Sequence, residues 1–263
     1  GTAMAGGDYT AISGTLTFTP GVTSQTFAIT IADDGLDEYD ETITLTLSNA
    51  DNATIGGVNS ATLTILDDDP SPSLSINDVS VVEGNSGSVN TVFSVTLSAA
   101  SSKPITVEYG TADGSATAPT DYTAIPTTTL TFAPGVTTQL LTVSVQGDTL
   151  DEPDETFWIN LANAVNASIG DAQGQGTIID DDGQPSVRFS RADYVIGEVA
   201  GSANITITLS NSYFLTATVD YATGGGTATA GGDYTAISGT LTFTPGVTSQ
   251  TFAVAIADDG MDE

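Results

Sequence analysis

The sequence predicts an all-β protein made of tandem Greek-key, immunoglobulin-like β-sandwiches. Apolar residues alternate with Thr and Ser at a period of two, as in Leu16, Phe18 and then Phe27, Ile29, Ile31, which is typical of half-buried antiparallel strands. The chain also repeats itself: the Asp-Tyr pair at Asp8 returns at Asp121 and Asp233, at spacings of 113 and 112 residues. About seven short strands in about 110 residues is the size of one Greek-key sandwich.

The repeats are close copies at the two ends of the chain. Residues 1–38 return as 226–263 with differences only at positions 4, 29, 30 and 36. The middle copy is more divergent and is the only complete one. The sequence therefore indicates a repeat array, in which each copy buries a core of its own.

The elements expected in the middle copy follow from the same alternation. Turn residues such as Ala133-Pro134-Gly135 separate some of them. No stretch has a 3.6-residue apolar period, so we expect little helix. The predicted strands lie near 74–82, 90–98, 104–110, 128–133, 138–146, 155–162 and 174–180.

Two short proline-containing linkers, 70–73 and 183–186, divide the chain and restrict the angle between neighbouring copies. We expect a partial repeat at 1–69 without its opening strands, a complete repeat at 74–182 and a partial repeat at 187–263 without its closing strands. We favour a window from a longer periodic array. The alternative is that strands of a neighbouring chain complete the two partial copies.

Composition excludes several classes of function. With 33 acidic and 3 basic residues the net charge is −30, which argues against nucleic-acid binding, because phosphate recognition needs a basic face. The chain contains no histidine and no cysteine, so the usual general base, triad partner and thiolate ligand are missing. No apolar run is long enough to span a membrane. We expect neither an enzyme nor direct membrane insertion.

The acidic residues are clustered at matched positions. The triplets Asp67-Asp68-Asp69 and Asp180-Asp181-Asp182 each end a copy just before a linker. The other markers are the Asp before Tyr, an acidic loop after a long strand and a Glu in the opening strand. In a Greek-key sandwich such segments can meet at one tip, and clustered oxygens are what Ca²⁺ needs, roughly 6–8 per ion. The alternative interpretation is acidity for solubility or salt adaptation. The spacing of an EF-hand is absent.

Together these segments resemble the Calx-β domain, a sandwich module of sodium–calcium exchangers, β4 integrins and bacterial surface proteins. The resemblance rests on the opening V-x-E-like strand, G-T-A-x-A-G-G-D-Y, L-T-F-x-P-G-V, D-D-x-x-x-E-x-x-E and the closing D-D-D. It covers essentially the whole chain as one complete and two partial copies. It implies Ca²⁺ as the bound cofactor.

The resemblance also implies a ligand set in each copy. In the middle copy it comprises Glu83, Asp121, Asp148, Glu152, Glu155, Asp180, Asp181 and Asp182, with the backbone carbonyl of Leu150. In the first copy the matches are Asp8, Asp33, Asp34, Glu38, Glu41, Asp67, Asp68 and Asp69, and in the third Glu198, Asp233, Asp258, Asp259 and Glu263. Gly147 replaces the Asp found at positions 33 and 258, so the middle copy is expected to bind fewer or weaker ions. Asp113 is a weaker candidate ligand.

The function expected from these features is structural. We expect a secreted or surface-attached protein whose repeats form a calcium-rigidified stalk or filament, used in adhesion to a target that the sequence does not identify. Its partners would be calcium ions and neighbouring repeats, in the same chain or in identical chains. The alternatives are regulatory calcium-sensor domains of a membrane protein and a non-catalytic appendage of a secreted enzyme.

Overall fold

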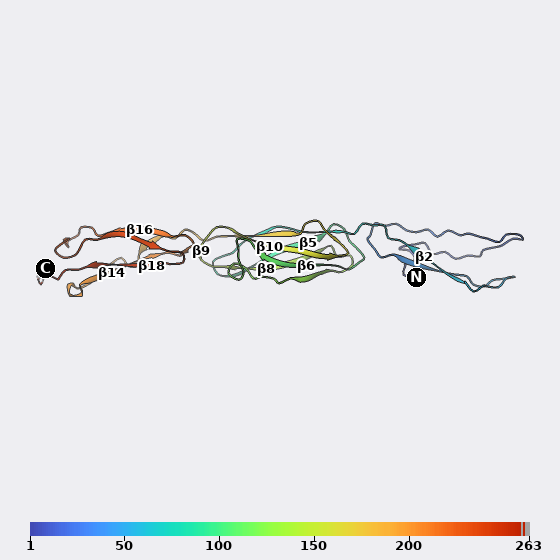
Figure 1. The fold of residues 1–263 in the computed structure, drawn as a ribbon, viewed down its shortest axis with the longest axis horizontal. Helices are drawn as coiled ribbons and strands as arrows, with labels where there is room; N and C mark the ends of the chain where they lie inside the picture. Colours follow the sequence, from blue (N-terminus) through green and yellow to red (C-terminus); the bar gives the residue numbers. More distant parts are fainter. Residues whose placement is uncertain (259, 261–263) are drawn as a thin grey trace.

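A computed structural model describes residues 1–258 and 260. The three copies lie end to end along the long axis of the molecule, with the N-terminal copy at one end and the C-terminal copy at the other (Figure 1). Most regular structure is strand, and the single helical segment in the described residues is a 3₁₀ turn at Glu198–Ala200. The part of the chain that the structure describes contains no helix with the length and apolar character of a membrane span.

The middle copy is a two-layered β-sandwich. Its five-stranded sheet has the order β4-β12-β10-β6-β7 and its four-stranded sheet the order β11-β3-β5-β8. Neighbours pair antiparallel except β4 with β12 and β3 with β11, which are parallel. The first sheet is formed by β4 (Val79–Val82), β12 (Gln173–Ile179), β10 (Glu155–Val165), β6 (Ile105–Asp113) and β7 (Thr128–Phe132), and the second by β11 (Ser168–Ile169), β3 (Ser73–Ile76), β5 (Gly87–Leu97) and β8 (Thr138–Gly147).

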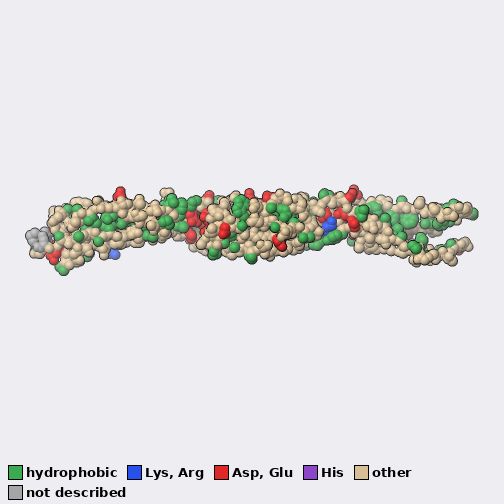
Figure 2. Space-filling view, viewed as in Figure 1, with side chains coloured by type: hydrophobic (Ala, Val, Ile, Leu, Met, Phe, Trp, Pro, Cys, Tyr) green, Lys and Arg blue, Asp and Glu red, His purple; other side chains and the backbone are tan. Residues whose placement is uncertain are grey.

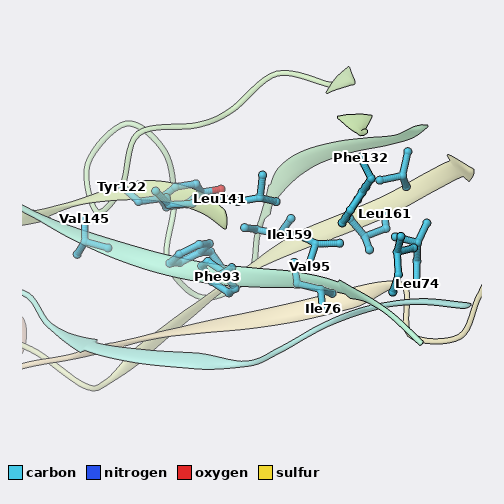
Figure 3. Close-up of a cluster of buried hydrophobic side chains, with 14 of the residues drawn as sticks. Leu74, Ile76, Phe93, Val95, Tyr122, Phe132, Leu141, Val145, Ile159 and Leu161 are labelled. Carbon is cyan, nitrogen blue, oxygen red and sulfur yellow. The ribbon is translucent and has the colours of Figure 1, made fainter. Parts of the chain in front are cut away.

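The core between these sheets follows from the alternation along each strand. Phe93 and Val95 on β5 and Phe157 and Ile159 on β10 are fully buried in one cluster. Figure 3 shows Phe93, Val95 and Ile159 pointing into the same interior. Tyr122 stacks on Phe157 with ring centroids 4.6 Å apart. Burial of such side chains contributes about 1.5–3 kcal/mol each, so this interior is the main source of stability for the copy.

The opening segment differs from the prediction of one strand at 74–82. It forms two strands, β3 and β4, which belong to different sheets. At the break, Asn77 Oδ1 accepts the backbone N–H of Ser94 at 2.6 Å, and Asp78 Oδ1 accepts that of Gln175 at 2.7 Å. These two side chains take over the ladder bonds while the chain crosses from one sheet to the other.

A glycine on β12 makes the close packing of the core testable. Gly176 is buried, and a Cβ built on it would overlap the ring of Phe157. We expect Gly176→Ala to destabilise the chain by about 1–3 kcal/mol, because overpacking forces side chains from their preferred rotamers. Urea unfolding measures the loss. Gly183→Ala is the matched control, since its Cβ would meet open space, and an equal effect of both variants would contradict this account.

The N-terminal copy contains only the closing part of a sandwich. Its strands β1 (Glu41–Thr46) and β2 (Ser60–Ile65) pair with each other and match β10 and β12. The apolar side chains that should face a second layer are open: Phe18 is 54% exposed and Phe27 is 50% exposed.

The C-terminal copy contains the opening part instead. Phe243, which matches Phe18, is only 1% exposed because a small core of Ile207, Leu209 and Phe243 forms there. Within the described residues the strands form the sheets β13-β14-β18 and β16-β17. Their bounds are β13 (Val187–Phe189), β14 (Ser202–Leu209), β16 (Ala217–Ala222), β17 (Ser238–Phe243) and β18 (Ser249–Ala255).

Neighbouring copies meet through short backbone pairings. β9 (Leu150–Asp151) in the acidic loop of the middle copy pairs in parallel with β15 (Ser212–Tyr213) of the C-terminal copy. At the other boundary, Asp37 forms a parallel bridge with Ser101. Acidic side chains gather at both boundaries on the visible face (Figure 2). The acidic loops therefore lie where one copy contacts the next.

Candidate metal centre

One group of three carboxylates lies at the C-terminal end of the middle copy. Asp121, Glu152 and Glu155 each place an oxygen within 4.8 Å of the others. Asp121 is fixed by the turn before it, because its Oδ2 accepts the backbone N–H of Thr117 at 2.7 Å. Glu155 begins β10, so it projects from a rigid strand. Three negative charges held this close repel one another unless protons or a cation neutralise them.

A second group lies at the same end. Glu83, Asp148 and Asp182 also place oxygens within 4.8 Å of one another. Glu83 follows β4 and is only 3% exposed. Asp148 lies in a tight turn, because its Oδ1 accepts the backbone N–H of Leu150 at 2.6 Å. The strand ends of the sandwich thus bring together residues that are far apart in the sequence.

Both groups have strongly perturbed acidities. Burial, and then the charges of Glu152 and Asp148, raise the pKa of Glu83 to about 8. Burial, and then Asp148 and Asp121, raise the pKa of Glu152 to about 7. Burial, and then Asp121 and Glu152, raise the pKa of Glu155 to about 7. Burial also raises the pKa values of Asp180 and Asp182. The fold by itself therefore disfavours full ionisation here.

Several oxygens in this region have no hydrogen-bond partner. Glu83 Oε1, Asp180 Oδ1 and Asp182 Oδ2 are buried and unpartnered. Leaving a buried carboxylate unpaired is costly, and most buried polar atoms in proteins find a partner. Hard cations such as Ca²⁺ take several carboxylate oxygens at once. The donor set, all oxygen and largely anionic, therefore fits Ca²⁺.

The N-terminal copy reproduces the first of these groups. Asp8, Glu38 and Glu41 lie within 4.8 Å of one another and match Asp121, Glu152 and Glu155. The hydrogen bond with Asp8, followed by burial, raises the pKa of Glu41. The same geometry therefore arises twice from matched residues.

The second group is matched at only one residue, because Asp69 corresponds to Asp182. In the N-terminal copy it consists of Asp33, Asp68 and Asp69. Asp33 stands where the middle copy has Gly147, and a Cβ at Gly147 would overlap the carbonyl oxygen of Gly84. The segment that contains Glu83 and Gly84 thus occupies the space that an Asp at 147 would need. The middle copy therefore supplies a carboxylate from Glu83, and the N-terminal copy supplies one from Asp33.

Other predicted residues lie outside these groups. Asp34 Oδ1 caps Leu36 N–H at 2.8 Å, and Asp181 Oδ1 accepts Gly84 N–H at 3.0 Å. Asp67 contacts Lys103 at 3.3 Å. Leu150 lies in β9 at the boundary with the next copy.

In the C-terminal copy the structure places fewer of the predicted residues together. Glu198 and Asp233 line one open cavity. Asp258 is exposed and belongs to none of the carboxylate groups found among the described residues. Asp259 and Glu263 lie outside the described residues.

Asp113 has a structural role in this arrangement. Its Oδ1 accepts the Tyr122 hydroxyl at 2.6 Å and the Ala118 backbone N–H at 3.0 Å. These hydrogen bonds lower the pKa of Asp113. The residue anchors a buried tyrosine of the core and lies outside both carboxylate groups.

The sequence interpretation missed the acids that orient the triplets. Asp154 Oδ1 accepts the backbone N–H of Asp180 at 3.2 Å, and Asp40 Oδ1 accepts that of Asp67 at 3.1 Å. Both occupy the same position between the two glutamates of the acidic loop. The recurrence of this Asp in both loops indicates a shared role. The sequence alone does not distinguish an Asp that accepts a backbone N–H from one that binds a metal.

The fold and this site define a class of protein: tandem all-β sandwiches whose strand ends gather carboxylates suited to calcium. The Calx-beta domain model matches residues 1–69, 71–182 and 180–263. The chain belongs to the Calx-beta family.

Similar proteins include extracellular matrix proteins and a sodium/calcium exchanger. Extracellular matrix protein 3 of Lytechinus variegatus is 30% identical over 278 residues, which cover 98% of this chain and 9% of that protein. Human FRAS1-related extracellular matrix protein 2 is 31% identical over 264 residues, which cover 92% of this chain and 8% of that protein. Human Sodium/calcium exchanger 2 is 32% identical over 174 residues, which cover 58% of this chain and 18% of that protein. The chain thus spans less than a fifth of the length of each of these relatives.

Two solved structures of Calx domains are also similar in part to this chain. The crystal structure of CBD12 from CALX1.2 is 26% identical, with a TM-score of 0.39, and the match covers 72% of this chain and 76% of that one. The apo-form Calx CBD1 domain is 29% identical, with a TM-score of 0.37, and its match covers 41% of this chain and 98% of that one.

Proposed function

We propose that this chain is a calcium-binding structural repeat region of a large extracellular protein. The observation that carries the proposal is the pair of three-carboxylate groups at the end of the middle copy, where Glu83 is 3% exposed with an unpartnered oxygen. Isolated surface acids explain neither that burial nor the recurrence of the first group in the N-terminal copy.

The residues that we propose to hold calcium in the middle copy are the two groups and their neighbours. Asp121, Glu152 and Glu155 form one site, and Glu83, Asp148 and Asp182 form the other, with Asp180 beside them. Bound Ca²⁺ would supply the positive charge that these carboxylates lack. The remaining predicted ligands stay proposals, as does the division into copies at residues 70–73 and 183–186.

The setting that we propose rests on the relatives. Extracellular matrix proteins match nearly the whole chain, which supports an extracellular location. The copies lie in line (Figure 1) and acidic side chains gather at their boundaries (Figure 2), which suits a stalk or filament stiffened by calcium. Adhesion is the role we propose for such a stalk, and we assign it no catalytic function.

A second candidate is a regulatory calcium sensor in a membrane protein. The similarity to Sodium/calcium exchanger 2 favours it. The two candidates differ in what surrounds these copies in the full gene product. Transporter segments would indicate the sensor, whereas further Calx-beta copies would indicate the array.

Calorimetric titration of the full chain with calcium, after treatment with chelator, tests the proposal. We expect saturable binding, and we expect Glu83→Gln to abolish the class of sites that contains Glu83. Glu108→Gln is the matched control, because it makes the same change of charge on β6, where Glu108 bonds to Asn163. Absence of binding by the parent chain, or equal stoichiometry in parent and Glu83→Gln, would refute the assignment.

A further inference from the structure

The boundary between the N-terminal and middle copies, which we call the first joint, has a defined backbone frame. Ser102 N–H donates to the carbonyl of Asp37 at 3.0 Å, and Gly135 N–H donates to the carbonyl of Ser101 at 2.9 Å. The acidic loop of the N-terminal copy is thus bonded to the loop at Ser101 and Ser102, and Gly135 fastens that loop within the middle copy.

The boundary between the middle and C-terminal copies, the second joint, uses the same frame. Phe214 N–H donates to the carbonyl of Asp151 at 3.3 Å, and Gly246 N–H donates to the carbonyl of Tyr213 at 3.1 Å. Asp151 matches Asp37, and Tyr213 matches Ser101. Differences between the joints must therefore arise from side chains.

At the first joint the side chains form an ionic cluster around a buried aspartate. Lys103 Nζ lies 2.8 Å from Asp37 Oδ1 and 3.3 Å from Asp67 Oδ2. Asp37 is only 2% exposed, and it also accepts the Ser101 hydroxyl at 2.6 Å and the Ser71 hydroxyl at 3.3 Å. Lys103 belongs to the middle copy and both aspartates to the N-terminal copy, so these bonds cross the joint.

The second joint has the acids without the cation. Asp151 and Asp180 match Asp37 and Asp67, but Leu215 stands in place of Lys103. Both salt bridges found among residues 1–258 and 260 are those of Lys103. The aromatic rings of Tyr213 and Phe214, 5.4 Å apart, replace the ionic cluster. Asp180 keeps a buried oxygen without a partner.

We propose that Lys103 is a built-in counter-ion that keeps the first joint docked whether or not calcium is bound, whereas the second joint, which lacks such a cation, docks stably only with calcium. The statement about the second joint rests on the proposed function. The statement about the first joint does not, since it requires only contacts within the chain.

The energetics favour this role for Lys103. A buried carboxylate without a partner is strongly unfavourable, so removing one member of a buried pair disrupts the structure around it. In the closed joint Lys103 and two serine hydroxyls donate to the Asp37 carboxylate, and opening the joint would remove the partners that cross it. Buried pairs are also little screened by salt.

Distance measurements across each joint test the proposal. The chain contains no cysteine, so Thr62→Cys, Thr142→Cys and Thr242→Cys introduce spin labels at exposed strand positions, one in each copy. In chelator we expect a narrow distance distribution between positions 62 and 142 and a broad one between 142 and 242. Adding Lys103→Leu should broaden the first distribution in chelator, and adding Leu215→Lys should narrow the second.

The control is Arg191→Leu, which removes a cation that lies away from both joints and contacts Tyr194. It should leave both distributions unchanged. An unchanged first distribution in Lys103→Leu, or equal broadening in Arg191→Leu, would overturn the role of Lys103. A second distribution that stays broad in Leu215→Lys would overturn the claim that the ammonium distinguishes the joints.

The outcomes also separate this inference from the proposed function. If the chain binds no calcium, the second joint will not respond to calcium, yet Lys103→Leu will still loosen the first joint. If calcium binds but Lys103→Leu has no effect, the calcium-binding proposal stands and only the role of Lys103 is lost.

Discussion

Calcium is expected to raise the melting temperature of the middle copy by roughly 10 °C or more. A ligand at roughly 100 times its dissociation constant stabilises the folded state by about 2.7 kcal/mol per site, and about 1 kcal/mol shifts the Tm of a domain of this size by roughly 4–8 °C. The middle copy holds two carboxylate groups, so two such terms can add. Differential scanning calorimetry of the full chain, in calcium and in chelator, measures the shift.

Calcium should also reverse the order of melting temperatures between the parent and a double variant. The double variant Glu83→Gln/Glu152→Gln removes two carboxylates whose pKa values burial and neighbouring charges raise, so in chelator it should melt above the parent. In calcium it should melt below the parent, because the ligands are gone. Glu108→Gln should follow the parent in both conditions. If the double variant is less stable than the parent in chelator, repulsion among these carboxylates does not destabilise the folded state.

The alternation of the strands made the fold readable from sequence, with one exception that is instructive. Apolar residues fall at Leu74 and Ile76 and then at Val79 and Val81, so the inward phase slips by one residue between them. That slip signals a change of sheet, and it is visible in the sequence. The prediction of one nine-residue strand at 74–82 followed the general alternation of apolar residues in this segment and took no account of the slip.

The candidate site was readable only in part. Recurrence at matched positions identified which acids belong together, but burial decides what each one does. Glu83 and Asp113 look alike in sequence, yet one is an unpartnered buried carboxylate and the other bonds to Tyr122. The role of Lys103 was unreadable, because its partners Asp37 and Asp67 belong to another copy and the matched residue is Leu215.

In chelator, the stability of the folded middle copy is expected to fall as the pH rises from about 4.5 to about 8. The carboxyl of Glu83 has a usual pKa of 4.5 and a folded pKa of about 8, and those of Glu152 and Glu155 are raised to about 7. Between these values the folded state binds more protons than the unfolded state, so the free energy of unfolding decreases with pH. The stabilising condition is thus the acidic one, below the unfolded pKa. Urea unfolding in chelator at pH 5 and pH 8 measures this directly.

Calcium should reverse that dependence, because metal binding requires the deprotonated carboxylates and so releases protons. The release is measurable by repeating the calorimetric titration at pH 7 in buffers with different ionisation enthalpies. The general repulsion of a chain with net charge −30 would also weaken the fold at higher pH, so Glu83→Gln is the decisive comparison. It should reduce the decrease between pH 7 and pH 8, because Glu83, with a pKa of about 8, keeps more of its proton in that range than Glu152 and Glu155, with pKa values of about 7, whereas Glu108→Gln should keep the parent slope. If Glu83→Gln and Glu108→Gln share one pH profile, the buried glutamate does not carry the linkage, and the acidity acts through net charge alone.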